Sequence, residues 1–220
     1  MIQYRCGILV PWVNTTVEED LRILPEYIQY NIGRVWPSKQ PNGANDESYL
    51  ESMKEHALQI AEQFGNLEFD DMFLACTSAA CQNVMFTTAG KQLQTVYGCL
   101  LSELRMNGYK NIYFASPYSE LMQEHFLSAL ERDGVHISKM ISIKCSGEFR
   151  DLNCNDVYAQ CSNAGLFSDI VPLVISCTAI TTRPLIQELK KKNIHCISSN
   201  SALINEIYRR TNSKNMRVSK

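Results

Sequence analysis

No stretch of this 220-residue sequence approaches the run of about 18 apolar residues that a membrane-spanning helix requires. The first segment, MIQYRCGILVPW, also lacks the charged start, apolar stretch and small-residue cleavage site of a signal peptide. Excess charge is scarce too, because 21 basic and 23 acidic residues leave a formal net charge of −2. Such a chain has no basic field to attract polyanions. We therefore expect a cytoplasmic protein that binds neither membranes nor nucleic acids.

Residues that hold metals or cofactors are also sparse. The four histidines are scattered and no Cys-x-x-Cys pair occurs, so zinc has no ligand set with its usual spacing. No glycine-rich phosphate loop is present, and no lysine lies in a context that suggests a Schiff base. We therefore expect neither a metal nor a cofactor.

Cysteine, by contrast, is abundant. The count of nine is odd, the chain is long and no signal peptide is visible, which favours reduced thiols over a disulfide framework. Two cysteines stand apart because each follows an apolar strand and precedes a threonine. The remaining seven have no such context and are expected to be structural: Cys6, Cys81, Cys99, Cys145, Cys154, Cys161 and Cys196.

Apolar periodicity predicts an α/β domain, and a content of 45% hydrophobic and 20% charged residues fits a globular chain. Short apolar runs predict strands at 4–10, 70–76, 111–118, 135–149, 171–177 and 195–199. Helical spacing and end signals predict helices at 48–64, 93–108, 119–134, 155–167, 183–193 and 201–210. The Pro- and Gly-rich segment 33–49 is expected to be a loop, of the kind that often forms a lid, and 211–220 a frayed tail.

The two halves of the sequence repeat one design. Pro11 and Pro117 each end a strand, and at a similar distance downstream FDDMFLACTSA and FSDIVPLVISCTAI each deliver a Cys-Thr pair. This predicts two similar α/β lobes with parallel sheets related by pseudo-twofold symmetry, with the active site in the cleft between them. Residues 1–98 and 205–220 would form one lobe, and 99–204 the other.

Two facing thiols, Cys76 and Cys177, support two kinds of chemistry. A helix N-terminus can lower a thiol pKa, and we expect both cysteines to lie where a helix begins. A thiolate and a thiol on opposite faces can then remove and return a carbon-bound proton, which is racemisation. A thiolate can instead add to an electron-poor double bond and allow rotation. Charge growing on a substrate carboxylate would be stabilised by Thr77, Ser78 and Thr178.

Other interpretations stand beside these. A cysteine that ends an apolar strand is usually a packing residue, although the paired recurrence favours function here. Asn14 and Tyr118 follow the two strand-ending prolines and would bind a carboxylate, or else act as a helix cap and a half-buried aromatic. Arg34 and Arg183 could pair with an acid, or remain solvated.

These residues bear a family resemblance over about positions 5 to 205. GILVPWVNTTVEEDL, ACTSAA, SPYSELMQEHFLSALERDG, ISCTAITT and SSNSAL resemble motifs of the maleate cis-trans isomerase and arylmalonate decarboxylase family, within the aspartate/glutamate racemase superfamily. The resemblance implies that Cys76 is the nucleophile or first acid/base and Cys177 the second. The residues it implies for binding the carboxylates are Pro11, Asn14, Thr77, Ser78, Tyr118, Thr178 and Asn200.

Having both cysteines favours an isomerase or racemase over the decarboxylase, which the resemblance implies would carry Gly at the first position. The segment after Cys177 lacks the Asn-Leu-Arg that often follows in the family, and PSKQPNGAND has no counterpart. We expect a cofactor-independent isomerase or racemase of a small carboxylate or dicarboxylate, and a homodimer or homotetramer is implied. The alternatives are an aspartate/glutamate racemase proper and a catalytically silent carboxylate-binding protein.

Overall fold

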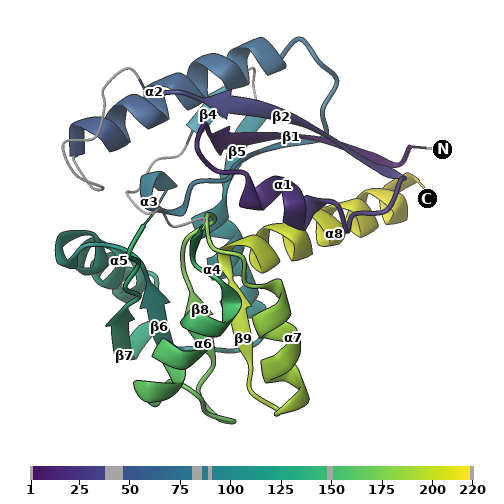
Figure 1. The fold of residues 1–220 in the computed structure, drawn as a ribbon. Helices are drawn as coiled ribbons and strands as arrows, with labels where there is room; N and C mark the ends of the chain where they lie inside the picture. Colours follow the sequence, from purple (N-terminus) through teal and green to yellow (C-terminus); the bar gives the residue numbers. More distant parts are fainter. Residues whose placement is uncertain (1, 38–46, 81–85, 89–90, 148–150, 219–220) are drawn as a thin grey trace.

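The computed structural model describes residues 2–37, 47–80, 86–88, 91–147 and 151–218, which form two sheets joined by helices (Figure 1). The strands of the first sheet are β1 (Tyr4–Pro11), β2 (Ile28–Val35), β3 (Asp71–Leu74), β4 (Phe86–Thr88) and β5 (Lys91–Thr95). Those of the second sheet are β6 (Asn111–Ser116), β7 (His136–Ser142), β8 (Leu173–Ile175) and β9 (Cys196–Ser198).

Both sheets use one strand order. The first runs β2-β1-β3-β5-β4 and the second runs β7-β6-β8-β9, so that in each lobe the first strand lies between the second and the third. All pairings are parallel except β4 with β5. The prediction of two similar α/β lobes is confirmed, and the third strand of each lobe is the one that leads to a Cys-Thr pair.

Helices connect the parallel strands, because a chain that forms two neighbouring parallel strands must cross back along the sheet between them. In the first lobe they are α1 (Thr16–Leu21), α2 (Glu47–Phe64) and α3 (Thr77–Ala80). They are followed by α4 (Val96–Met106), α5 (Glu120–Arg132), α6 (Cys154–Asn163), α7 (Arg183–Lys191) and α8 (Ser199–Val218). No helix of the described residues is long and apolar enough to cross a membrane.

The first residues of the segment predicted as a loop, 33–35, instead form the end of strand β2. Polar residues interrupt this strand, so it shows no apolar run that would predict a strand. Its backbone nevertheless pairs in register with β1 along its full length. A Cβ on Gly33 would lie only 2.7 Å from Ile60 Cγ2 and 2.9 Å from Leu9 Cδ2. The glycine is therefore needed for helix α2 to pack closely on the sheet. Most of the expected lid, residues 38–46, lies outside the described residues.

Two other predicted boundaries are wrong. The helix expected at 93–108 begins only at Val96, because Lys91–Thr95 pairs with β3 as strand β5. The tail expected to fray from Thr211 is the second half of α8, which continues to Val218.

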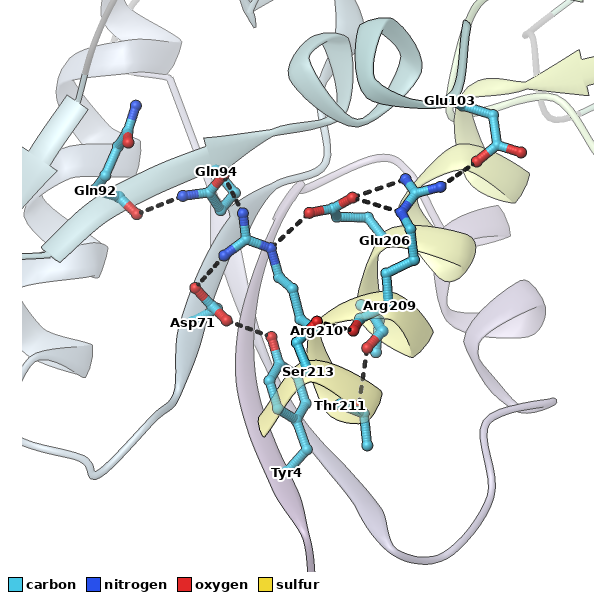
Figure 2. Close-up of polar contacts among 11 residues, drawn as sticks. Tyr4, Asp71, Gln92, Gln94, Glu103, Glu206, Arg209, Arg210, Thr211 and Ser213 are labelled. Carbon is cyan, nitrogen blue, oxygen red and sulfur yellow. Dashed lines mark hydrogen bonds and ion pairs between the residues drawn. The ribbon is translucent and has the colours of Figure 1, made fainter. Parts of the chain in front are cut away.

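Side chains of α8 explain why that helix continues. Arg210 forms ion pairs through Nη1 with Asp71 on β3 at 2.7 Å and through Nε with Glu206 at 2.7 Å. Its Nη2 donates to the side-chain oxygen of Gln94 on β5 (Figure 2). Lys214, one turn later, forms an ion pair with Asp70 at 2.7 Å. Asp71 and Gln94 lie in the first sheet and Asp70 directly precedes β3, so α8, which starts beside β9, connects the second sheet to the first (Figure 1).

Candidate active site

The two Cys-Thr pairs meet where the two sheets face each other. Strand β3 ends at Leu74 and β8 at Ile175, and each cysteine follows two residues later. The hydroxyl of Thr178 donates to the carbonyl of Ala75 at 3.0 Å, which joins the end of β8 to the end of β3. Cys76 and Cys177 are free thiols, each with 8% of its surface exposed. The repeat in the sequence thus places one buried thiol from each lobe at the same junction.

Ser199, the first residue of α8, connects the two Cys-Thr pairs. Its hydroxyl accepts from the hydroxyl of Thr77 at 3.0 Å and from the backbone N–H of Cys177 at 3.2 Å. The Ser78 hydroxyl lies 3.5 Å from the sulfur of Cys76. Because Ser199 and Thr77 are almost fully buried, these short hydroxyl contacts hold the two lobes in fixed register. Ser199 stands in the motif SSNSAL, but no role for it was predicted from the sequence.

Asn14 caps helix α1, one of the two roles that its position suggested, and its amide nitrogen is bonded to the protein. Its Oδ1 accepts from the backbone N–H groups of Thr16 at 3.0 Å and Val17 at 3.3 Å, which satisfies the start of α1. Its Nδ2 donates to the hydroxyl of Thr178 at 2.9 Å, across the lobe boundary. Pro11 contributes its carbonyl, which accepts from the backbone N–H of Asn14 at 2.9 Å.

Arg34 lies beside this turn and is fully engaged by the protein. Its guanidinium donates to the carbonyl of Asn14 at 2.6 Å and forms an ion pair with Glu18. The acid with which it pairs is therefore part of the chain, and the arginine holds the turn that carries Asn14. Arg183, by contrast, is exposed and lies at the start of α7.

Tyr118 is buried against the ring of Phe126, with ring centroids 5.3 Å apart. Burial, followed by the nearby Cys177 thiol, raises the pKa of Tyr118 well above its ordinary value. Its hydroxyl in turn interacts with Cys177 and lowers the pKa of that thiol. The predicted binding residue is therefore an un-ionised phenol that faces the second cysteine.

Tyr49, near the start of α2, is a neighbour of the first cysteine that sequence reasoning missed. Burial and the Cys76 thiol both raise the pKa of Tyr49. Tyr49 is the last residue of the loop predicted at 33–49. No apolar pattern precedes it that would indicate which way its side chain points. Each thiol thus has a phenol nearby, Tyr118 for Cys177 and Tyr49 for Cys76.

Burial makes both thiols weaker acids, contrary to the expectation that helix N-termini would lower their pKa values. Burial, together with a smaller contribution from the Cys76 thiol, raises the pKa of Cys177 to about 12. Burial also raises the pKa of Cys76, but hydrogen bonds from Ser78 and from the backbone of Ala79 lower it. The difference follows from position: α3 begins directly after Cys76, whereas α7 begins only at Arg183, six residues after Cys177.

The backbone at Cys177 has φ of 144°, a region that residues with a side chain rarely adopt. Asn193 is the other described residue apart from glycine with positive φ. Contacts on both sides hold the conformation at Cys177: its N–H donates to Ser199, and Thr178 is tied to Ala75 and Asn14. Strained backbone of this kind tends to occur at functional sites, where the surroundings fix a side chain in one direction.

Asn200 lies behind the site and is occupied by protein groups. Its Nδ2 donates to Asp20 Oδ2 at 2.8 Å and to the carbonyl of Thr178 at 3.1 Å. Its Oδ1 is buried without a hydrogen-bond partner among the described residues. Among those residues, no group of three or more His, Cys, Asp or Glu side chains is arranged to hold a metal ion.

In each of the two similar lobes a cysteine follows the third strand, so the chain has a two-lobed α/β fold with a thiol at the same place in both lobes. Solved structures match it over nearly the whole chain. A maleate cis-trans isomerase from Nocardia farcinica bound to TRIS aligns with TM-score 0.79 and 18% identity, covering 95% of this chain and 92% of that chain. A cysteine-to-serine mutant of that isomerase with a covalently bound succinylcysteine intermediate aligns with TM-score 0.77 and 17% identity, covering 95% of this chain and 93% of that chain.

Arylmalonate decarboxylase aligns with TM-score 0.71 and 17% identity, covering 94% of this chain and 92% of that chain. No family model matches the chain, and no curated protein matches it in sequence. The chain therefore has the fold of the maleate isomerases and arylmalonate decarboxylase, as the motif resemblance predicted.

Proposed function

We propose that the protein is a cofactor-independent isomerase of a small carboxylic acid, with a cis-dicarboxylate such as maleate as its first candidate substrate. The observation that carries the proposal is the placement of two buried free thiols, Cys76 and Cys177, one from each lobe, at the junction where Thr178 bonds to Ala75. Thiol addition and elimination can isomerise an alkene between carboxylates, so the bond-making steps can be carried by these two side chains.

In this proposal Cys76 reacts as the thiolate, having released its proton to solvent. Its sulfur forms a bond to one olefinic carbon, and the π electron pair moves to the other carbon, where the Cys177 thiol donates its proton. The resulting succinyl thioether has a single C–C bond, which rotates. The Cys177 thiolate then removes the proton, the C–S bond breaks with its electron pair returning to Cys76, and the trans alkene forms.

The assignment of these roles rests on the surroundings of the two sulfurs. Cys76 has three hydrogen-bonding influences that favour its thiolate, from the Ser78 side chain and from the backbone of Ser78 and Ala79. Cys177, with its pKa raised to about 12, holds its proton at neutral pH and is suited to be the acid. A thiolate at Cys76 is also easier to form while its neighbour remains neutral.

The carboxylates would be held by neutral donors. Ser78 and Tyr118 offer hydroxyls beside the two sulfurs, and backbone N–H groups follow each cysteine. In a buried site such fixed donors stabilise charge that grows on a carboxylate during addition, because no solvent reorganisation is required. Thr77 donates its hydroxyl proton to Ser199 and would act by positioning. Asn14, Thr178 and Pro11 would act by positioning these donors, since their polar groups are bonded to the protein. Asn200 would do the same through its Nδ2, which donates to Asp20.

Trapping of the thioether tests the proposal. Serine in place of Cys177 cannot return as an effective base, so the Cys177→Ser variant incubated with maleate should gain the mass of one maleic acid, located at Cys76 by peptide mapping. The Cys76→Ser/Cys177→Ser double variant should gain nothing. Cys6→Ala is the matched control, because Cys6 lies near the opposite end of β1 from Pro11 and should leave turnover unchanged. An adduct that persists without Cys76 would contradict the proposal.

A further inference from the structure

A pocket lies away from Cys76 and Cys177, among helices α1, α7 and α8. We define the α1–α7–α8 pocket by Asp20, Ile23, Arg183, Ile186 and Ile204, which are among its lining residues. Its volume is about 130 Å³, close to that of an engineered cavity of about 150 Å³ that binds benzene. Neither Cys76 nor Cys177 lines it. The pocket is therefore large enough for a small organic molecule and separate from the proposed catalytic site.

The apolar wall of this pocket comes from three helices. Ile23 follows the end of α1, Ile186 lies one turn into α7, and Ile204 lies on α8. Ile204 is 7% exposed, while Ile23 and Ile186 are half-buried. Three branched aliphatic side chains at one opening favour a ligand with a short aliphatic group, because burying each methylene contributes about 0.8 kcal/mol.

Two opposite charges face the same space without neutralising each other. Asp20 is 7% exposed, and its Oδ2 accepts from Asn200. The Arg183 guanidinium attracts the carboxylate of Asp20, yet within the described part of the chain it forms no hydrogen bond or ion pair. A ligand with only one charge would be attracted by one of these groups and repelled by the other. A zwitterion satisfies both.

From this arrangement we propose that the α1–α7–α8 pocket binds a small aliphatic α-amino acid. The ammonium group would bind the carboxylate of Asp20, and the ligand carboxylate would bind the guanidinium of Arg183. The aliphatic side chain would lie against Ile23, Ile186 and Ile204. Helix α7, which begins at Arg183 without a side-chain cap from Thr182, adds the positive end of its dipole on the carboxylate side.

Asn200 links this pocket to the proposed catalytic loop. The same Nδ2 donates to Asp20 and to the carbonyl of Thr178, the residue after Cys177. An amino acid bound at Asp20 thus lies two hydrogen bonds from the backbone that presents the second thiol. The inference concerns a separate binding site and does not depend on the proposed isomerase reaction.

Isothermal titration calorimetry of the full chain tests the proposal with L-valine and L-leucine. Isobutylamine and isovalerate, each of which carries one of the two charges, serve as comparison ligands. We expect binding of the amino acids at least about tenfold tighter than of either comparison ligand, because each charge-assisted contact is worth a factor of this order. The Cys76→Ser/Cys177→Ser variant should bind equally well, which separates this site from the catalytic proposal.

Variants assign the two charged contacts. Asp20→Asn, which keeps an acceptor for Asn200, should weaken amino-acid binding at least about tenfold and weaken isobutylamine with it, but not isovalerate. Arg183→Gln, on an exposed side chain, should weaken amino acids and isovalerate and spare isobutylamine. Glu188→Gln is the matched control on α7, outside this pocket, and should change nothing. Absence of amino-acid binding at millimolar concentration, or equal affinities in the Asp20, Arg183 and parent proteins, would overturn the proposal.

Discussion

Replacing Cys177 by glycine should relieve backbone strain that alanine retains. Cys177 has φ of 144°, whereas Cys76 is not among the described residues with positive φ. The two cysteines are otherwise matched, because each is 8% exposed and follows a buried strand. Comparing glycine with alanine at both positions therefore isolates the effect of the backbone conformation.

The magnitude follows from two contributions. At Cys76, glycine should be less stable than alanine by about 1–2 kcal/mol, since it loses the burial of a Cβ and adds freedom to the unfolded chain. At Cys177 the same costs apply, but glycine also releases strain of about 1–3 kcal/mol. The net effect at Cys177 therefore lies between glycine being about 1 kcal/mol less stable than alanine and about 2 kcal/mol more stable.

Urea unfolding of the four variants, Cys76→Gly, Cys76→Ala, Cys177→Gly and Cys177→Ala, measures both gaps. The free energies of unfolding should show a glycine-to-alanine gap at Cys177 that is more favourable to glycine by about 1–3 kcal/mol than the gap at Cys76. Equal gaps at the two positions would refute the reasoning that the backbone at Cys177 is strained.

Three further predictions concern the contacts around the site. Thr178→Val removes the hydroxyl that bonds both Ala75 and Asn14, so it should lower the free energy of unfolding by about 2–4 kcal/mol in urea unfolding, whereas Thr178→Ser should lower it far less. Because burial raises the pKa of Cys177 to about 12, that thiol contributes stability below the ordinary thiol pKa of about 8.5 that is lost as pH rises toward 12. Between pH 8 and 10 the parent should therefore lose about 1–2 kcal/mol more than Cys177→Ser, and an equal loss would contradict this. Arg210→Ala removes the contacts with Asp71 and Glu206 and should cost about 1–2 kcal/mol by thermal or urea unfolding, with Arg210→Lys intermediate.

The strands with continuous apolar runs could be predicted from the sequence, and the interrupted ones could not. Runs such as MFL before Cys76 and LVI before Cys177 are buried on both faces, so their composition alone indicates strands. Strand β2, with Asn31 and Arg34 among its residues, is held by pairing with β1, a contact that local composition does not reveal.

The ends of helices show the same division between local and distant causes. Gly108 and Gly134 follow α4 and α5 with positive φ, so the predicted helix ends at these glycines are close to those observed. The continuation of α8 through Lys214 depends on Asp70 and Asp71, more than a hundred residues away in sequence. A polar composition indicated a frayed tail only because those partners could not be seen.

At the candidate site, repetition within the sequence was enough to select Cys76 and Cys177. The electrostatic expectation was wrong because it counted the helix dipole and left out burial, which dominates the pKa of both thiols. Tyr49 and Ser199 were missed for a different reason. Their approach to the thiols depends on how α2 and α8 pack, and neither residue type signals such a role by itself.

Proton NMR of the reduced protein in deuterated water, with maleate and both enantiomers of aspartate and glutamate as substrates, is the decisive test of the two-thiol reaction. We expect maleate to turn to fumarate without added metal or cofactor, and Cys76→Ser and Cys177→Ser each to abolish turnover. Deuterium entering the α-carbon of an amino acid, lost in both variants, would keep the two-thiol chemistry and identify a racemase instead. Turnover that survives in both single variants would contradict the claim that these two thiols act as a pair.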